Sequence, residues 1–119
     1  MAERAMPSFT KSPPELIERF STVLAAYPHA VRKQMFGYPA AFVGGNLATS
    51  LFRDDWVVRL ADDEIEAAKA AGAASFEPLP GKPMKAFVVI PRADVADDAA
   101  LRRWVERGLA LASSMPAKK

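Results

Sequence analysis

The side chains that could carry out acid–base or metal chemistry are few in this sequence. It contains one histidine, His29, and no cysteine, which excludes disulfides, thiolate nucleophiles and sulfur-ligated metals. A lone histidine can act as a general base near neutral pH. His29, however, follows Tyr27-Pro28 and has no acidic or nucleophilic residue close in sequence. The pattern therefore predicts a solvated loop histidine, and we expect no nucleophile, no general base, no zinc site and no cofactor.

The acidic run Ala-Asp-Asp-Glu at 61–64 is the other pattern that could bind a metal. Clustered carboxylates are ligands that Mg²⁺ and Ca²⁺ prefer. This run, however, stands where a helical pattern begins, and it lacks calcium-loop spacing. Acidic residues in a first helical turn interact favourably with the helix dipole. We therefore interpret the run as a helix start and predict that the protein is not an enzyme.

Three basic residues are candidates for an anion or interaction site. Arg59 lies inside an otherwise apolar run, and Lys82 and Lys85 lie on the C-terminal side of Gly81 in a loop. This loop does not match a phosphate loop or a dinucleotide fingerprint, which need a strand, a glycine loop and a helix in order. Arg59 could pair with an acidic side chain, or line a shallow anion site with Lys85. The alternative is a charge at the sheet's rim whose stem packs flat.

Tyr38 is the fourth candidate, within the run Met-Phe-Gly-Tyr-Pro at 35–39. One interpretation makes Phe36 and Tyr38 an exposed aromatic recognition patch. The other makes the run a strand end that enters the core. In that case Gly37 permits positive φ, and Pro39, which lacks an N–H, starts the next strand. We favour the structural interpretation.

The charge pattern does not indicate a nucleic-acid-binding surface. Net charge is only +2, and no block of like charge stands out. The last predicted helix carries Arg102, Arg103 and Arg107, which could contact phosphates. Acidic residues are interleaved with them, which favours a solvated face. We therefore expect weak or absent direct binding to nucleic acid.

Hydrophobic periodicity predicts a single α+β domain with an antiparallel sheet of about five strands and three helices. Ser12 is the expected N-cap of the first helix, with Pro13 in its first turn and Glu15 completing a capping box. Gly44-Gly45 and Arg53-Asp54-Asp55 are expected hairpin turns. The other expected elements are a helix in 61–72, a central strand in 84–91 and one long helix in 94–116.

Strict alternation along the strands predicts two faces of the sheet. The core face is expected to hold Phe42, Leu47, Leu51, Trp56, Val58 and Leu60. The opposite face is expected to hold Ala41, Val43, Ala48, Ser50, Val57 and Arg59. Such a small, apolar face suits close approach of another surface. We therefore expect a homodimer through this face or the adjoining sheet edge; the alternative is that a helix of the same chain covers it.

From about residue 32 to 115 the chain resembles the N-terminal domain of the TfoX/Sxy family. The resemblance rests on the Met-Phe-Gly start, the Gly-Asn hairpin, the Arg-Leu strand end and the Gly-Lys-Pro-Met turn, in that order. Many members have a second glycine after Met-Phe-Gly, where this sequence has Tyr38-Pro39. The resemblance implies a bacterial domain of secretion-chaperone-like architecture with no known enzymatic activity.

The resemblance also sets the functional expectations. The namesake proteins promote competence gene expression together with the cyclic-AMP receptor regulator. We expect a short, stand-alone member without their C-terminal helical domain, either a regulatory or a protein-interaction domain, that acts through a protein partner. The alternatives are a transcription-associated factor working with a DNA-binding partner, or a domain that binds a small anionic ligand.

Domain organisation is simple. We expect a loose arm at 1–11, one domain at 12–115 and a tail at 116–119. The N-terminus has no apolar h-region, and no stretch approaches the length of a membrane span. We therefore expect a cytoplasmic protein.

Overall fold

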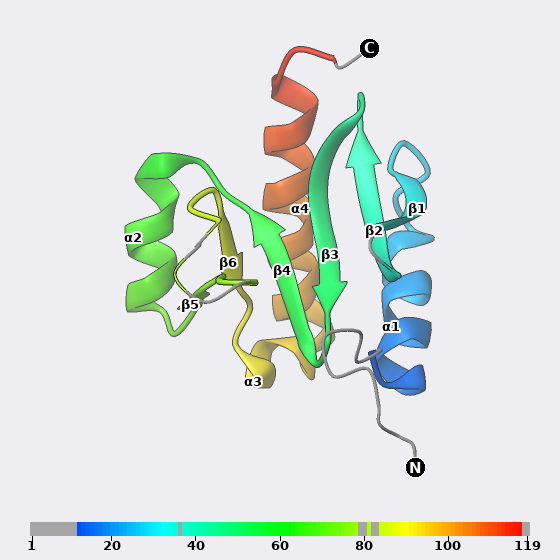
Figure 1. Ribbon diagram of the computed structural model, residues 1–119, viewed down its shortest axis with the longest axis horizontal. Coiled ribbons are helices and arrows are strands. Elements are labelled where there is room, and N and C mark those ends of the chain that lie inside the picture. The colour runs from blue at the N-terminus through cyan, green and yellow to red at the C-terminus, as the bar shows by residue number, and fades with distance from the viewer. Residues whose placement is uncertain (1–11, 36, 79–80, 82–83, 118–119) are drawn as a thin grey trace.

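A computed structural model describes residues 12–117 apart from 36, 79–80 and 82–83. An open antiparallel sheet has the strand order β1-β2-β3-β4-β6-β5, and helices pack against it (Figure 1). The predicted α+β class is confirmed, with six strands and four helices among the described residues. The elements are α1 (Pro14–Leu24), β1 (Val31–Met35), β2 (Tyr38–Val43), β3 (Asn46–Phe52), β4 (Asp55–Arg59), α2 (Asp62–Ala70), β5 (Ala74–Ser75), β6 (Phe87–Val89), α3 (Arg92–Val95) and α4 (Asp98–Ser114).

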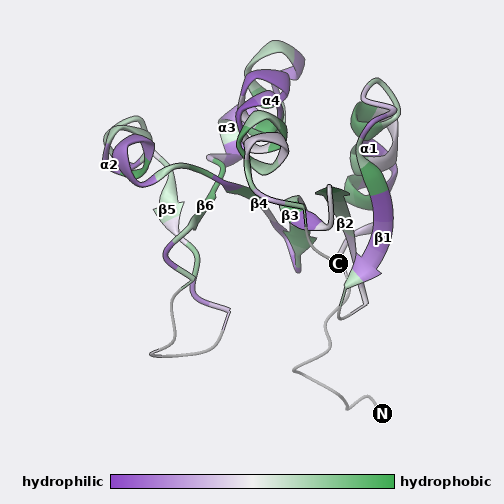
Figure 2. Cartoon of the chain, turned by 90° about the horizontal axis from the view of Figure 1, so that it is seen from above, coloured by the Kyte–Doolittle hydropathy of each residue, from purple (hydrophilic) through white to green (hydrophobic). Residues whose placement is uncertain are grey.

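The helices all lie on one side of the sheet, so the domain has two layers (Figure 2). Between the layers lies the main core, in which Phe20 of α1 packs on Trp56 of β4 with ring centroids 5.1 Å apart. Leu101 and Val105 of α4 are fully buried in the same core. None of the helices in the described ranges is long and apolar enough to cross a membrane.

Both predicted hairpins are present. The turn Gly44-Gly45 has φ of 59° and 80°, which a two-residue hairpin of the favoured type requires and glycine adopts without strain. It pairs Val43 with Asn46 and Phe42 with Leu47, as expected. The second turn pairs Leu51 with Trp56, which confirms that these two residues share a face.

A β-bulge in β3 overturns part of the predicted face assignment. Phe42 pairs with Leu47 and Ala41 pairs with Thr49, so Ala48 is an extra residue with no partner in β2. One extra residue reverses the alternation on one side of the bulge. Phe42 and Leu47 were expected under the helices, but they lie on the opposite face.

The three small residues expected on the free face lie under the helices instead. Ala41 and Ala48 are completely buried in the main core, and Val43 packs against it. The expectation of a small, flat, exposed patch built from these residues was therefore wrong. Ser50, Val57 and Arg59 do lie on the side away from the helices.

The helix ends also differ from the predictions. The capping box is wrong, because Pro13 is the N-cap of α1 and makes no side-chain cap bond, and the buried Ser12 hydroxyl has no hydrogen-bond partner among the described residues. The single last helix is divided into α3 and α4. Asp97 separates them, because its Oδ1 accepts hydrogen bonds from the amides of Ala99 and Ala100 at 3.1 and 3.4 Å and caps α4.

The face of the sheet away from the helices, called the second face here, carries its own apolar cluster. Figure 2 shows this side of the sheet without a covering helix. The buried members are Ala40, Leu47, Val57, Phe76 and Phe87, and the partly buried members are Met35, Phe42, Phe52, Ala86 and Val89. The face is thus apolar and aromatic, and the residue after β5, Phe76, packs edge-on against Phe52 at 5.3 Å.

Candidate functional site

Groups suited to catalysis are not brought together among the described residues. His29 is exposed in the turn between α1 and β1, as expected of a solvated loop histidine. The acidic run begins α2, whose N-cap Ala61 makes no side-chain cap bond, so its charges act on the helix dipole alone. In the described ranges no group of three or more histidine, aspartate or glutamate side chains could hold a metal ion.

Arg59 packs flat on the second face. Its Nε donates a hydrogen bond to the carbonyl oxygen of Leu47 at 2.6 Å, and its guanidinium lies 4.8 Å from the centre of the Phe87 ring. Burial lowers the pKa of Arg59 below its ordinary value. The ion pairs of the described residues do not include it. This arrangement matches the interpretation of a rim charge with a packed stem.

Lys85 is exposed and lines a different hollow, between α2 and β6. Asp62 and Glu66 line the same hollow together with Lys69, so carboxylates stand beside the lysines. Arg59 is not among its lining residues. The structure therefore does not bring Arg59 and Lys85 into one cavity, and the predicted Lys82 lies outside the described residues. Binding of an anion at these side chains stays a prediction.

Tyr38 is buried, with 6% of its surface exposed, and its ring packs on Phe52 at 5.3 Å. It forms part of the wall of a cavity of about 160 Å³ on the second face. Other walls of this cavity are Leu47, Val57, Phe76, Pro78, Met84 and Phe87. Tyr38 therefore belongs to the apolar interior of the second face and is not an exposed recognition residue.

Three phenylalanine rings of the second face each carry a cation. Lys33 Nζ lies 5.8 Å from the centre of Phe42, Arg53 Cζ lies 5.2 Å from that of Phe52, and Arg59 lies over Phe87. We call Lys33, Arg53 and Arg59 the cationic collar. Such contacts leave the charge at the edge of the ring system and let the aliphatic stems cover apolar surface. The second face is therefore an apolar centre within a basic rim.

Two of the three arginines on α4, Arg102 and Arg107, contact side chains of the helix layer. Arg102 Nε donates to Asp98 Oδ2 at 2.9 Å, and this hydrogen bond raises the pKa of Arg102 above its ordinary value. Arg107 lies 5.4 Å from the centre of Trp104, whose Nε1 donates to Asp94 Oδ2 at 2.9 Å. Neighbouring carboxylates thus offset part of the positive charge on α4 that would be needed to bind phosphate groups.

These contacts predict weak binding to duplex DNA. With a net charge of +2, the domain can neutralise few phosphates at once, and phosphate contacts dominate such affinity. In a fluorescence titration at physiological salt, we expect only weak, sequence-independent binding that decreases further as salt is added. A sequence-selective complex of submicromolar affinity would contradict this expectation.

Sequence reasoning identified Arg59 but missed the rest of the collar. Arg53 was interpreted as a turn residue and Lys33 was not singled out. A signal was available for Lys33, because residues 31–35 alternate, which places Lys33 on the same face as Met35. Its contact with Phe42 depends on the β1–β2 register, in which Val31 pairs with Phe42 and Lys33 with Ala40, and the alternation within one strand does not show that register.

Fold and site together define a small α+β domain with one sheet face under the helices and a second, apolar face that none of the described helices covers. The model of the TfoX N-terminal domain family matches residues 22–112. The chain therefore belongs to the TfoX N-terminal domain family. No curated protein and no solved structure matches it.

Proposed function

We propose that this domain acts through protein–protein contact and not through catalysis, and that it forms a homodimer through the second face. The observation that carries the proposal is the partly exposed apolar cluster on a sheet face that none of the described helices covers. Solvent-facing sides of antiparallel sheets normally alternate to polar residues. A regulatory role in the cell is consistent with such a binding domain.

The apolar centre of the second face suits burial against a similar surface. Phe42, Phe52 and Met35 are each partly buried, and Met84 beside them is 38% exposed. Burying apolar surface contributes about 25 cal/mol per Å². A second copy related by a twofold axis presents the same centre, which is the commonest way in which proteins cover such a face.

The cationic collar gives the homodimer a characteristic salt dependence. Lys33 and Arg53 are exposed at the rim, so two collars approach each other when two faces meet. Like charges near water repel, and salt screens that repulsion over distances of about 8–10 Å. Dimerisation should therefore strengthen as salt is added, whereas binding of an acidic partner would weaken.

Replacing Phe42 with glutamate should separate the dimer without unfolding the protomer. Phe42 is partly buried and Lys33 Nζ lies 5.8 Å from its ring centre, so the new carboxylate has a cation within reach in the monomer. In the dimer it would be buried in an apolar interface, which we expect to weaken association by about 2–3 kcal/mol, or roughly a hundredfold. Sedimentation velocity at matched concentrations measures the change.

The matched control is Ala110→Glu, an exposed position of α4 in the helix layer. It introduces the same charge away from the second face and should leave association unchanged. Circular dichroism checks that both variants are folded. Equal association of the Phe42 variant and the unmodified protein would exclude the second face as the interface.

A further inference from the structure

The free edge of β1 is a second candidate interaction surface. β1 is the first strand of the sheet, and within the part of the chain that the structure describes it pairs only with β2. Four of its five residues are exposed. One of them is the apolar residue Val31, with 51% of its surface accessible. A strand at the edge of a sheet presents unpaired backbone groups that can pair with another extended chain.

The backbone groups at this edge can be identified from Pro39. In antiparallel pairs, residues alternate between those bonded to the neighbouring strand and those pointing away from it. Pro39 has no N–H, so its partner Gln34 stands at a non-bonded pair. By alternation Lys33 points its N–H and C=O toward β2, while Arg32 and Gln34 point theirs to the free edge.

The two-residue turn at Gly44-Gly45 leads to the same assignment. Closing such a turn makes Val43 exchange hydrogen bonds with Asn46 in β3. Counting back by alternation, Phe42 and Ala40 then point their backbone groups toward β1, where their partners are Val31 and Lys33. No described residue forms a backbone hydrogen bond to the free-edge groups of Arg32 and Gln34.

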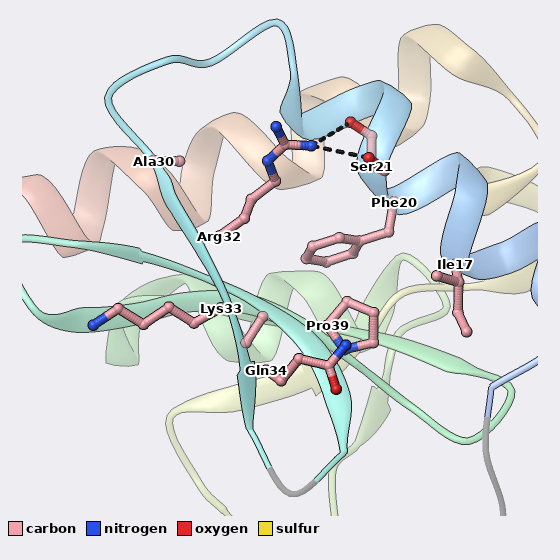
Figure 3. Close-up of a pocket in the computed structure, with 9 residues that line it drawn as sticks. Ile17, Phe20, Ser21, Ala30, Arg32, Lys33, Gln34 and Pro39 are labelled. Carbon is pink, nitrogen blue, oxygen red and sulfur yellow. Dashed lines mark hydrogen bonds between the residues drawn. The ribbon is translucent and has the colours of Figure 1, made fainter.

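A groove of about 570 Å³ runs between α1 and this edge (Figure 3). Ile17, Phe20 and Ser21 line it from the helix, and Arg32, Gln34 and Pro39 line it from the strands. Ile17 is 37% exposed there. The groove is therefore partly apolar, and it lies beside backbone groups that can accept a strand.

The free edge of β1 carries two cations, Arg32 on the groove side and Lys33 on the second face. Arg32 Nη1 donates to the carbonyl oxygen and the Oγ of Ser21 at 3.1 and 2.9 Å (Figure 3), which holds the guanidinium beside α1. Lys33 extends away from α1 in the same view. The ion pairs among the described residues include neither cation, and none of the described lining residues is acidic.

We propose that β1 binds an extended, acidic segment of a partner protein by strand addition, with one face of that segment in the α1–β1 groove. The partner's backbone would bond to Arg32 and Gln34, and its alternate side chains would face the groove and the second face. Carboxylates opposite Arg32 and Lys33 form favourable cross-strand pairs. An apolar side chain opposite Gln34 lies on the groove face, where it contacts Ile17 and Pro39. This is a known mode of peptide recognition.

A second copy of β1 is a poor occupant of this edge. Antiparallel pairing of two β1 strands about a twofold axis places Lys33 opposite Lys33, or Arg32 opposite Arg32, in the registers centred on these residues. Like charges directly opposite each other destabilise a sheet. Edge lysines commonly prevent such self-pairing. The inference therefore goes beyond the proposed homodimer and uses a different surface.

The test uses the full chain and two capped, fluorescein-labelled peptides, Thr-Val-Glu-Glu-Val-Thr and its basic counterpart Thr-Val-Lys-Lys-Val-Thr. The two adjacent charges of each peptide lie on opposite faces of an extended strand, as Arg32 and Lys33 do. We expect fluorescence polarisation to detect binding of the acidic peptide only. Gln34→Pro removes the free-edge N–H while leaving the β1–β2 bonds intact, and proline is tolerated where the N–H faces solvent. It should abolish binding, whereas Gln34→Ala keeps the N–H and should bind like the unmodified protein.

Charge reversal and hydrogen exchange complete the test. The double variant Arg32→Glu, Lys33→Glu should lower the affinity about tenfold or more, and the control Lys69→Glu, Arg103→Glu, at exposed positions on α2 and α4, should not. Bound peptide should slow amide exchange at Arg32 and Gln34 but not at Lys33.

Three outcomes would overturn the proposal. The first is that the acidic peptide does not bind. The second is that the Gln34→Pro variant binds this peptide as tightly as the unmodified protein does. The third is that Gln34→Pro converts a dimer to a monomer, which would place a second copy of the chain at this edge. The Phe42→Glu variant leaves the free edge of β1 intact. If this variant is monomeric and still binds the acidic peptide, the peptide site and the dimer interface are different surfaces.

Discussion

Replacing Gly108 with valine is expected to destabilise the domain by more than about 3 kcal/mol, because no space exists for a side chain there. A Cβ at this position would lie 2.5 Å from Val58 Cγ2 and 2.7 Å from the carbonyl oxygen of Ala48. The Ala48 oxygen belongs to the bulge in β3, so it cannot move without disturbing the sheet. Such a loss is a large part of the 5–15 kcal/mol by which domains are stable.

Urea unfolding followed by circular dichroism measures this effect. The matched control is Ala110→Val, at an exposed position of the same helix, where valine's lower helix propensity should cost less than about 1 kcal/mol. Gly108→Ala separates packing from propensity, since alanine favours the helix by about 1 kcal/mol and yet should still destabilise. An alanine variant as stable as the unmodified protein would show that α4 does not pack closely on the bulge.

Truncating Trp56 to alanine is expected to cost about 3–5 kcal/mol, the usual range for a buried tryptophan. Trp56 keeps only 1% of its surface exposed, and its ring packs on Phe20 at 5.1 Å. Its Nε1 donates to Thr49 Oγ1 at 2.9 Å, and Thr49 in turn donates to the carbonyl oxygen of Val57. The substitution removes both the packing of α1 on the sheet and this buried hydrogen bond.

Two further variants divide that loss into its parts. Trp56→Phe retains most of the ring contact with Phe20 but not the indole N–H, so we expect a loss of about 1–2 kcal/mol. Thr49→Val leaves the indole N–H buried without its partner, and an unsatisfied buried donor costs about 1–3 kcal/mol. If Trp56→Ala unfolds at the same urea concentration as the unmodified protein, the core described between α1 and β4 is wrong.

The parts of the fold that local chemistry determines could be predicted from the sequence. Gly44-Gly45 specified its hairpin because few residues adopt positive φ, and the Asp62–Glu64 run marked the start of a helix. The bulge at Ala48 could not be predicted, because β3 reads as an uninterrupted strand. Its position depends on α4, whose Gly108 lies against Ala48, and a contact between residues so far apart leaves no local signal.

The small size of Ala41 and Ala48 was recognised as a sign of close approach by another surface. That surface is α4 of the same chain, as one of the two alternatives held, and not a partner. Phe42 and Leu47 of the second face were assigned to the core for the same reason, since the bulge exchanges the faces there. Periodicity therefore assigned the residues after the bulge to the correct faces, but it assigned Ala41, Phe42, Val43, Leu47 and Ala48 to the wrong ones.

The candidate site was less predictable than the fold. Arg59 attracted notice because it is charged within an apolar run, and its packed stem followed from that. The cationic collar joins residues of two strands and a turn, and only the assembled sheet places Lys33, Arg53 and Arg59 on one face. The free edge of β1 likewise follows from the strand order, which a sequence does not state.

Light scattering of the unmodified protein across a micromolar dilution series, at low and high salt, tests the proposed homodimer most directly. The second face predicts a mass of twice 12.9 kDa at the higher concentrations, with a dimer fraction that increases with salt because the collar charges are screened. A mass near 12.9 kDa at every concentration and both salt conditions would contradict it.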